Sequence, residues 1–339
     1  MKHGPKHYSL VALQIVVAVL LFALFLSLYK YTETLLVDEC KEKASRDLER
    51  IQLTIRREMQ QVETATEAFA MLEFGNGTDI PNDSAHIFRS LERFIQAMPP
   101  SITGAIIGFE DGVLPRYEAK YGFIPLVRYV DNEYIRYQLG GVRDIRTIHD
   151  WYRETKRLDH KRWAEPQLAE EGEVICGYCF PLHDAAGKFI GVLEVDFSLD
   201  LLSKEVCNIR TFPTAEPMVV SGEDDFTILM CPQEDVALKE TMQSLLEKRG
   251  GLRIEDDILK SVHKGENRSH HIRQGTFNDV HEVFFHHMRD PYTGWTIQMT
   301  CPASEVTVAL LSLRLRMTVI AITILALMFI VALTYMRRF

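Results

Sequence analysis

Two aromatic residues and one carboxylate are the side chains in this sequence best suited to recognising a small molecule. Trp151 and Tyr152 would supply a flat apolar wall and a hydroxyl group, and a ligand pocket needs apolar walls with a few convergent polar groups. Asp196 follows a largely apolar run where another core residue would be expected. Its carboxylate could hold a cationic group through charge-assisted hydrogen bonds. The alternatives are a core position for Trp151 and, for Asp196, the cap of a helix that starts near Leu199.

The six cysteines are scattered and do not form the disulfide framework of a small secreted domain. Cys176 and Cys179 make a C-x-x-C pair, but we expect the pair on a strand, where residues three apart point to opposite faces. Neither a disulfide nor a shared metal ion is expected from it. The sequence also has no nucleophile elbow, Walker loop, zinc-protease motif or kinase motif set. We therefore predict no catalytic residue, no metal ligand and no cofactor.

Histidines are dense toward the C-terminal end of the sequence: His263, His270, His271, His281, His286 and His287. Imidazoles suit zinc, copper or nickel, so a membrane-anchored metal-binding protein or enzyme is the alternative function. Adjacent histidines on a strand face opposite ways, which leaves at most one of each pair for a common site. We expect a solvated edge of an antiparallel sheet here, and a pH-sensing role stays open.

The elements that must position these residues lie between two uncharged apolar stretches, residues 9–29 and 317–336. Each has about 20 residues, enough for a helix to cross a hydrocarbon core about 30 Å thick. Lysines precede the first stretch and arginines follow the second, and such charge marks the cytoplasmic side of a membrane. We therefore expect short cytoplasmic ends, residues 1–8 and 337–339, and an extracytoplasmic body, residues 30–316. No small-residue cleavage site follows the first stretch, which favours an uncleaved anchor over a signal peptide.

The charge balance of the body limits its partners. The chain has 38 basic and 47 acidic residues, and some of the basic ones belong to the cytoplasmic ends. An acidic body argues against binding to nucleic acid or to anionic lipid heads. Its length is also too great for one small module, so two modules are expected.

The body should begin with a stalk helix over residues 30–73. Apolar residues recur mostly three or four positions apart, which is typical of one face of a helix: Leu48, Ile51, Ile55, Met59, Val62, Phe69 and Leu72. No glycine or proline interrupts the pattern, and such a helix would reach roughly 60 Å from the membrane at about 1.5 Å per residue. Turn-forming residues follow at positions 75–83.

Two mixed α/β modules should follow, a membrane-distal one over residues 74–210 and a membrane-proximal one over residues 211–304. In the first we expect helices over residues 86–98 and 198–205, and strands over 102–109, 174–182 and 188–197. In the second we expect strands over 217–221 and 227–230, helices over 232–248 and 255–263, and a three-stranded antiparallel sheet from residues 268–273, 281–288 and 294–299. Residues 305–336 should form a coupling helix and the second transmembrane helix.

Short motifs between residues 144 and 202 resemble, in their order and spacing, the double Cache family of extracytoplasmic sensors. That family shows an aromatic pair at a helix start, a Trp-x-x-Pro loop, a strand ending in proline, a hairpin glycine and a Gly-Val-x-x-x-Asp strand that enters a helix. Here these motifs are Trp151-Tyr152, Trp163-Ala164-Glu165-Pro166, residues 178–181, Gly187 and residues 191–196. Downstream, residues 293–306 resemble the end of the family's membrane-proximal module.

The resemblance implies an α/β (α+β) fold of two PAS-like modules on a long stalk helix between two transmembrane helices. The distal module would hold a small ligand, and the candidate contacts are Trp151, Tyr152, Asp196, His149, Tyr178 and Trp163. In the amino-acid-sensing branch an arginine stands two residues before the tryptophan; here His149 stands there, and Arg143 and Arg146 are out of register. Gln167 and Ala169 replace a tyrosine and an aspartate of that branch. The ligand class therefore stays open.

The resemblance also implies a two-pass receptor of a bacterial inner membrane. Ligand binding would shift the second transmembrane helix, across a homodimer held by stalk and transmembrane helices. The signal would reach a cytoplasmic histidine kinase, chemoreceptor, cyclase or serine/threonine phosphatase effector, which we expect outside this chain because the second span is followed by only three residues, 337–339. The remaining alternatives are the histidine-based metal protein and a partner-binding ectodomain without a small ligand.

Overall fold

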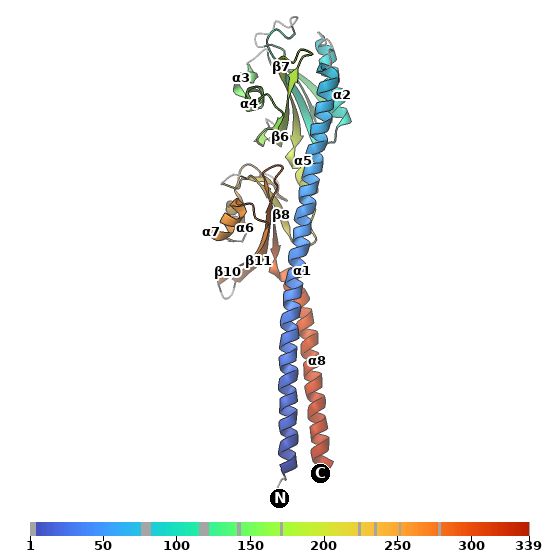
Figure 1. The fold of residues 1–339 in the computed structure, drawn as a ribbon, viewed down its shortest axis with the longest axis vertical. Helices are drawn as coiled ribbons and strands as arrows, with labels where there is room; N and C mark the ends of the chain where they lie inside the picture. Colours follow the sequence, from blue (N-terminus) through green and yellow to red (C-terminus); the bar gives the residue numbers. More distant parts are fainter. Residues whose placement is uncertain are drawn as a thin grey trace.

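The computed structural model describes residues 5–75, 83–114, 122–140, 144–169, 172–222, 225–233, 236–250, 252–276 and 279–338. Two modules are stacked along helix α1 (Pro5–Phe74), and helix α8 (Ala303–Arg338) runs beside the N-terminal part of α1 (Figure 1). The N- and C-termini consequently lie at the same end of an elongated molecule (Figure 1). The terminal residues 1–4 and 339 and most of the expected turn, residues 76–82, lie outside the described residues.

Helix α1 contributes one apolar face to the cores of both modules. Its buried apolar residues recur mostly three or four positions apart, as one face of a helix requires: Ala44, Leu48, Ile51, Ile55, Met59, Val62, Ala70 and Phe74. They share one core cluster with side chains from both sheets. The predicted stalk helix is confirmed, although Leu72, expected on the apolar face, is 76% exposed.

The distal module is an antiparallel sheet with α1 and helix α2 (Ser84–Ala97) on one face and the short helices α3 (Ile145–Ile148) and α4 (Asp150–Leu158) on the other (Figure 1). Its elements are α2 (Ser84–Ala97), β1 (Ile102–Phe109), β2 (Pro125–Val130), β3 (Glu133–Gln138), α3 (Ile145–Ile148), α4 (Asp150–Leu158), β4 (Arg162–Trp163), β5 (Gln167–Leu168), β6 (Val174–His183), β7 (Phe189–Ser198) and α5 (Leu199–Val206). The strand order is β3-β2-β1-β7-β6-β4, and β5 also pairs with β6. The three strands and two helices predicted for this module are confirmed within two residues of their ends.

The hairpin of β2 and β3 is an element that the sequence reading missed. Its turn residues, Asp131 and Asn132, have φ of 52° and 67°, the left-handed conformation that two-residue hairpin turns require and that Asp and Asn tolerate. The flanking strands alternate apolar and charged side chains only weakly, since Arg128 and Arg136 interrupt them. The Asp-Asn pair was the available signal.

Ser198, and not Asp196, caps helix α5. The Ser198 Oγ atom accepts a hydrogen bond from the Leu201 N–H at 3.2 Å, as an N-cap serine does. Asp196 lies two residues earlier, within strand β7. The cap alternative for Asp196 is therefore wrong, and its carboxylate faces the sheet.

The proximal module is a second antiparallel sheet with two short helices (Figure 1). Its elements are β8 (Glu216–Val220), β9 (Ile228–Met230), α6 (Met242–Gly250), α7 (Asp256–His263), β10 (Arg268–Thr276), β11 (Asp279–Arg289) and β12 (Thr296–Pro302). The order β10-β11-β12-β8-β9 extends the expected three-stranded sheet to five strands, because β8 pairs with β12.

The helix predicted over residues 232–248 is wrong in its first half. Helix α6 starts at Met242. Before it, the Leu238 N–H donates to the Ile228 carbonyl at 2.7 Å, and the Ile228 N–H donates to the Glu240 carbonyl at 2.9 Å. Backbone groups before α6 are therefore hydrogen-bonded to β9 and are not available for the hydrogen bonds of a helix, although the segment contains residues that favour helices.

Buried polar contacts fasten α1 to the proximal module. The Asp290 carboxylate, in the turn between β11 and β12, accepts from Arg56 Nε at 2.8 Å and from Gln52 Nε2 at 2.9 Å. The Asp47 carboxylate accepts from the Thr211 N–H at 2.5 Å and from the Thr211 hydroxyl at 3.0 Å. The link between the modules and the last turn of the sheet are thus both attached to the stalk.

Among the described residues, one helix is long and apolar enough to cross a bilayer by length and composition: α1 from Val16 onward. The apolar part of α8, Leu315–Val331, is shorter. The first expected transmembrane helix therefore has the length and hydropathy that a membrane span requires. The second transmembrane helix remains a proposal.

Candidate functional site

A cavity of about 300 Å³ lies in the distal module, between the start of helix α4 and the segment of β4 and β5. It is lined by Ile148, His149, Asp150, Trp151, Glu154, Arg162, Ala164, Glu165, Pro166 and Gln167. Two of the predicted contacts, His149 and Trp151, are among these residues. The others lie elsewhere in the module.

Trp151 and Tyr152 pack helix α4 onto the sheet. They are 5% and 3% exposed, and their rings stand perpendicular with centroids 5.4 Å apart. Both rings lie over Gly108 of β1, where a Cβ atom would come within 2.7 Å of Tyr152 and 3.1 Å of Trp151. The missing side chain at Gly108 therefore lets the two aromatic residues reach the sheet. Trp151 is both a core residue and a wall of the cavity.

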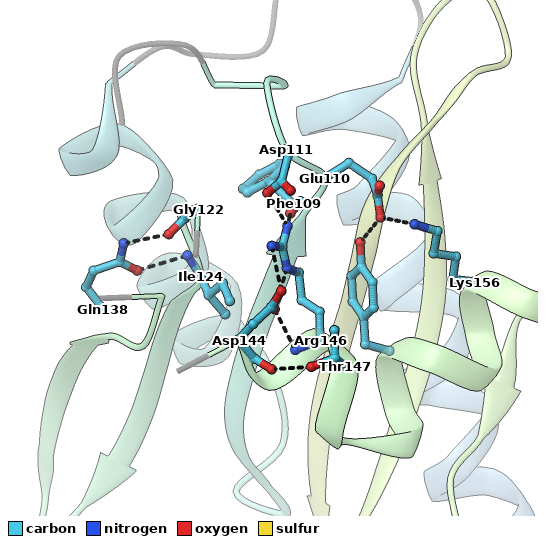
Figure 2. Close-up of polar contacts among 11 residues, drawn as sticks. Phe109, Glu110, Asp111, Gly122, Ile124, Gln138, Asp144, Arg146, Thr147 and Lys156 are labelled. Carbon is cyan, nitrogen blue, oxygen red and sulfur yellow. Dashed lines mark hydrogen bonds and ion pairs between the residues drawn. The ribbon is translucent and has the colours of Figure 1, made fainter. Parts of the chain in front are cut away.

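The hydroxyl of Tyr152 is already engaged. It donates to the Glu110 carboxylate, which also accepts from Lys156 Nζ at 2.6 Å (Figure 2). Burial, and then the Glu110 charge, raise the pKa of Tyr152 far above its ordinary value. The phenol stays protonated and points away from the cavity toward the end of β1.

Arg146, which the sequence placed near the expected ligand arginine, is a structural residue. Its guanidinium donates to Asp144 at 2.8 and 3.1 Å, to the Phe109 carbonyl at 2.7 Å, and lies 2.9 Å from Asp111 (Figure 2). These contacts attach the loop before α4 to the end of β1. Arg146 is 7% exposed and is no cavity residue, while Arg143 lies outside the described residues.

Asp196 and Glu194 form a buried carboxylate pair on the face of β7 that is turned toward α4. They are 7% and 3% exposed. Asp196 lies over Gly104, where a Cβ atom would meet its Oδ2 at 2.6 Å and the Arg128 side chain at 3.3 Å. Glu194 lies over Gly177, where a Cβ atom would meet its Oε1 at 2.0 Å. Asp196 thus lies beside the aliphatic part of Arg128 and is not among the residues that line the cavity.

Glu194 was missed by the sequence reading. Within the described part of the chain its Oε1 atom has no hydrogen-bond partner. Burial, reinforced by the charge of Asp196, raises its pKa well above the ordinary value. The signal was the alternation in residues 193–196, which places Glu194 and Asp196 on one face of a strand whose other face is apolar.

Arg162 is the second residue that was missed. In the register of the sheet it pairs with Cys179, which pairs in turn with Glu194, so the three side chains share a face. Arg162 lines the cavity. Its buried Nη1 atom has no hydrogen-bond partner among the described residues.

Trp163 and Tyr178, expected in the ligand site, lie on the opposite face of the sheet. Trp163 Nε1 donates to Glu63 Oε1 at 2.7 Å, and the Tyr178 hydroxyl donates to Glu67 Oε1 at 2.9 Å. Both glutamates belong to α1. Trp163 follows Arg162 directly, and successive residues of a strand point to opposite faces. The structure therefore separates these two residues from the cavity and places them at the contact with the stalk.

The six cysteines are free thiols. Cys176 belongs to the core cluster facing α1, and Cys179 belongs to the cluster facing α4. The expectation that the C-x-x-C pair points to opposite faces is confirmed. Burial raises the pKa of both thiols, which makes them poor nucleophiles.

The histidines do not form a solvated edge throughout, because β11 lies between two other strands. His286 and His287 are 2% and 0% exposed. His286 Nδ1 lies 2.6 Å from Ser269 Oγ, and His287 Nε2 lies 3.1 Å from His270 Nε2. Among the residues whose side chains the structure describes, which exclude His281, no group of three or more His, Cys, Asp or Glu could hold a metal ion.

No protein-family model and no curated protein matches the chain. Solved structures do match. The extracellular domain of the histidine kinase mmHK1S-Z3 aligns with a TM-score of 0.60 and 18% identity, over 82% of this chain and 98% of that domain. The ligand-binding domain of the Campylobacter jejuni chemoreceptor Tlp3 in complex with L-valine aligns with a TM-score of 0.57 and 15% identity, over 82% and 98%. A methyl-accepting chemotaxis protein X aligns with a TM-score of 0.56 and 17% identity, over 80% and 99%.

The fold is therefore that of extracellular sensor domains of histidine kinases and chemoreceptors, as the double Cache resemblance predicted. The predicted fold class, a long N-terminal helix with two mixed α/β modules, is confirmed.

Proposed function

We propose that this chain is the sensory part of a two-pass receptor in a bacterial cytoplasmic membrane, with residues 30–316 outside the cytoplasm. The apolar start of α1 and the common end of α1 and α8 support this topology (Figure 1). The fold supports a sensory role, because the solved structures that share it are sensor domains.

The observation that carries the proposal is the cavity beside α4. Its volume of about 300 Å³ suits a small metabolite, at the lower end of the usual range for ligand pockets. Trp151 gives it an apolar wall, and His149 and Arg162 give it polar groups. A ligand there would contact α4 and β4 together.

Strand β4 offers a direct route from the cavity to the stalk. Arg162 faces the cavity, and the next residue, Trp163, is hydrogen-bonded to Glu63 on α1. A ligand can shift a conformational equilibrium only through different affinities for two states. A ligand that repositions β4 would change the Trp163–Glu63 contact and thereby the seating of the distal module on α1.

The link between the modules offers the second half of the route. Thr211 is bound to Asp47 of α1, and the Thr214 N–H donates to Glu305 at the start of α8 at 2.8 Å. Helix α8 also continues directly from β12. Displacement of this link relative to α1 would therefore pull on α8, whose movement would be the output across the membrane.

The proposed assembly is a parallel homodimer through α1 and α8, which signals to a cytoplasmic kinase, chemoreceptor, cyclase or phosphatase domain or protein. Leu53 and Leu72, apolar residues of α1 that are 63% and 76% exposed, are available for a helix contact with a second copy.

The test is a ligand screen on the full chain in lipid nanodiscs, with thermal unfolding as the first readout. Amino acids, organic acids, amines and polyols would be compared for the protein, Trp151→Ala and the control Tyr129→Ala, an exposed aromatic residue of β2. At least one compound should raise the unfolding temperature of the protein and of the control but not of Trp151→Ala. The same compound should switch a kinase fused after α8. If no compound stabilises the protein, ligand sensing by this cavity is excluded.

A further inference from the structure

We infer that the proximal module has a proton-binding site at the Nδ1 atom of His287, where an added proton is held by the side-chain oxygen of Gln298. The two residues are cross-strand partners on β11 and β12, and they are 0% and 1% exposed. The inference goes beyond the proposed function, because it adds acid as a second input that acts on the proximal module and not on the distal cavity.

Both atoms that define the site are buried and unused. Within the described part of the chain, His287 Nδ1 and Gln298 Oε1 have no hydrogen-bond partner, although buried polar atoms rarely stay in that state. The other end of the Gln298 amide is engaged, since its Nε2 atom donates to the Met218 sulfur atom at 3.1 Å. Two neighbouring strands thus carry two unused polar atoms at one cross-strand position.

A hydrogen-bond chain on the other side of the ring shows which nitrogen of neutral His287 carries the proton. The hydrogen bond from Ser261 lowers the pKa of Glu266 below its ordinary value, so this carboxylate is ionised and can only accept. The Ser261 hydroxyl therefore donates to Glu266 at 2.8 Å. Its oxygen atom, 3.5 Å from His287 Nε2, can then only accept from that nitrogen. The proton is assigned to Nε2, and Nδ1 is an acceptor that faces no donor.

His270 makes the second contact of the Nε2 proton. Its Nε2 atom lies 3.1 Å from His287 Nε2. The ring planes are within 5° of parallel and the ring centroids are 5.2 Å apart, which is the nitrogen–nitrogen distance plus about two ring radii. The rings therefore meet end to end with one proton between them. A proton added to His270 Nε2 would break this hydrogen bond, whereas a proton added to His287 Nδ1 keeps it and makes it charge-assisted.

The surroundings of His287 place proton uptake in the acidic range. The charged and titratable groups that act on it come from β10, β11 and the loop after α7: His270, Arg268, His286 and Glu266. Burial, and then His270, lower the pKa of His287 to about 4, and Glu266 alone among these groups opposes the decrease. A hydrogen bond to Gln298 would form only in the protonated state and would also oppose it.

The added proton would change the contact between two strands of the sheet. In the neutral state two acceptors face each other across β11 and β12, and in the protonated state a hydrogen bond would join them. Strand β12 continues directly into α8. The two states differ in their affinity for the proton, as a switch driven by a ligand requires, and the change occurs on the strand that leads to the proposed output helix.

The experiment is an NMR titration of the full chain in nanodiscs with isotope-labelled histidine rings, from about pH 7.5 to about pH 4. We expect the Nδ1 signal of His287 to move toward that of a protonated nitrogen, while its Nε2 signal stays that of a bonded N–H. Gln298→Leu removes the acceptor and should lower the midpoint by about 1 pH unit, whereas Gln298→Glu adds a negative charge and should raise it by about 1–2 pH units. The control His271→Gln changes the neighbour of His270, whose side chain lies on the opposite face of β10 and binds Glu282. It should leave the midpoint unchanged.

Thermal unfolding at neutral pH shows whether each variant is folded, and the two Gln298 variants give independent readings. A midpoint that rises in Gln298→Leu would overturn the inference, because Gln298 would then be a donor to Nδ1 in the neutral state. A His287 ring that stays neutral at about pH 4 in both the protein and Gln298→Glu would also overturn it. Neither result bears on the small-molecule screen, which tests the proposed function separately.

Discussion

The indole nitrogen of Trp163 lies 2.7 Å from the Oε1 atom of Glu63, which joins strand β4 of the distal module to the stalk helix. The hydroxyl of Tyr292, in the last turn of the proximal module, donates to the same oxygen atom. One carboxylate on α1 therefore holds a contact from each module. A change in the position of β4 would therefore alter the hydrogen bonding of Glu63, to which Tyr292 of the proximal module is also bound.

Glu63→Ala should uncouple the modules while leaving the cavity intact, because Glu63 lies on the opposite face of the sheet. The change leaves the partly buried Trp163 N–H without its acceptor, so we expect the free energy of unfolding to fall by about 1 kcal/mol. Output from a kinase fused after α8 should lose most of its response to ligand. Glu49→Ala, an exposed position on the same helix, is the control. A Glu63→Ala receptor with a normal response would remove Glu63 from the signalling route.

The parts of the fold that the sequence predicted well are those with long periodic patterns. The 3.6-residue repeat of the stalk and the apolar runs of β1, β6 and β7 are strong signals because one face or both faces of these elements are buried. The β2–β3 hairpin was missed because it is short, partly exposed and carries arginines. The first half of the helix predicted over residues 232–248 was wrong because the backbone of Leu238 and Glu240 is hydrogen-bonded to Ile228 of β9. No local sequence pattern predicts such a contact.

Of the residues that line the cavity, only those within or next to a recognised sequence motif were predicted. His149 and Trp151 do line the cavity. Arg162 and Glu194 were missed because their significance lies in a cross-strand row through Cys179 that exists only after β4, β6 and β7 have paired. Trp163 was expected in the site because nothing in the sequence states which face of a two-residue strand it occupies.

Asp290→Asn should detach the proximal module from the stalk. The Asp290 carboxylate is 1% exposed and binds Arg56 and Gln52 of α1 together with Thr293 of its own turn. Breaking such a pair leaves a partly buried guanidinium uncompensated, so urea denaturation should show a loss of about 2–3 kcal/mol. The control Asp257→Asn changes a carboxylate whose side chain is 90% exposed and should cost little.

The pH dependence of the Asp290 contact has a defined sign. Burial alone would raise the pKa of Asp290, but the hydrogen bonds from Arg56 and Thr293 outweigh it and hold the pKa below 3.8. The contact therefore stabilises the fold above pH 3.8 and loses this effect as the pH falls through the lowered value. The difference in stability between the protein and Asp290→Asn should shrink in that acidic range. A difference that stays constant down to pH 2 would contradict this assignment.

Acid should destabilise the proximal module through its buried histidines. Burial, with smaller contributions from Lys41 to His286 and from His270 to both, lowers the pKa of His286 and of His287 from 6.5 to about 4. The groups facing them are Ser269, Lys41, His270, Glu266, Arg268 and Ser261. Between pH 6.5 and 4 the unfolded chain binds more protons than the folded one, so stability is complete above pH 6.5 and falls as the pH is lowered.

Urea denaturation at several pH values tests this prediction. His287→Gln should reduce the slope of stability against pH in the range from 6.5 to 4, by at most about 1.4 kcal/mol per pH unit. His160→Gln, at an exposed position, should leave the slope unchanged. Equal slopes for the protein and His287→Gln would show that His287 does not titrate differently in the folded state.

Glu194→Gln should stabilise the distal module at neutral and alkaline pH. Burial and the neighbouring Asp196 raise the pKa of Glu194 well above 4.5, so the folded state keeps a proton that the unfolded chain releases. The stabilisation from this protonated group is complete below pH 4.5 and is lost as the pH rises toward the folded-state pKa. Glutamine has nearly the same shape, stays neutral at every pH and removes that loss.

In urea denaturation of the full chain, Glu194→Gln should match the protein at pH 4 and exceed its stability at pH 8. A variant that is less stable than the protein at pH 8 would mean that Glu194 is ionised in the fold and balances a cation, for which Arg162, whose charge acts on Glu194, is the candidate.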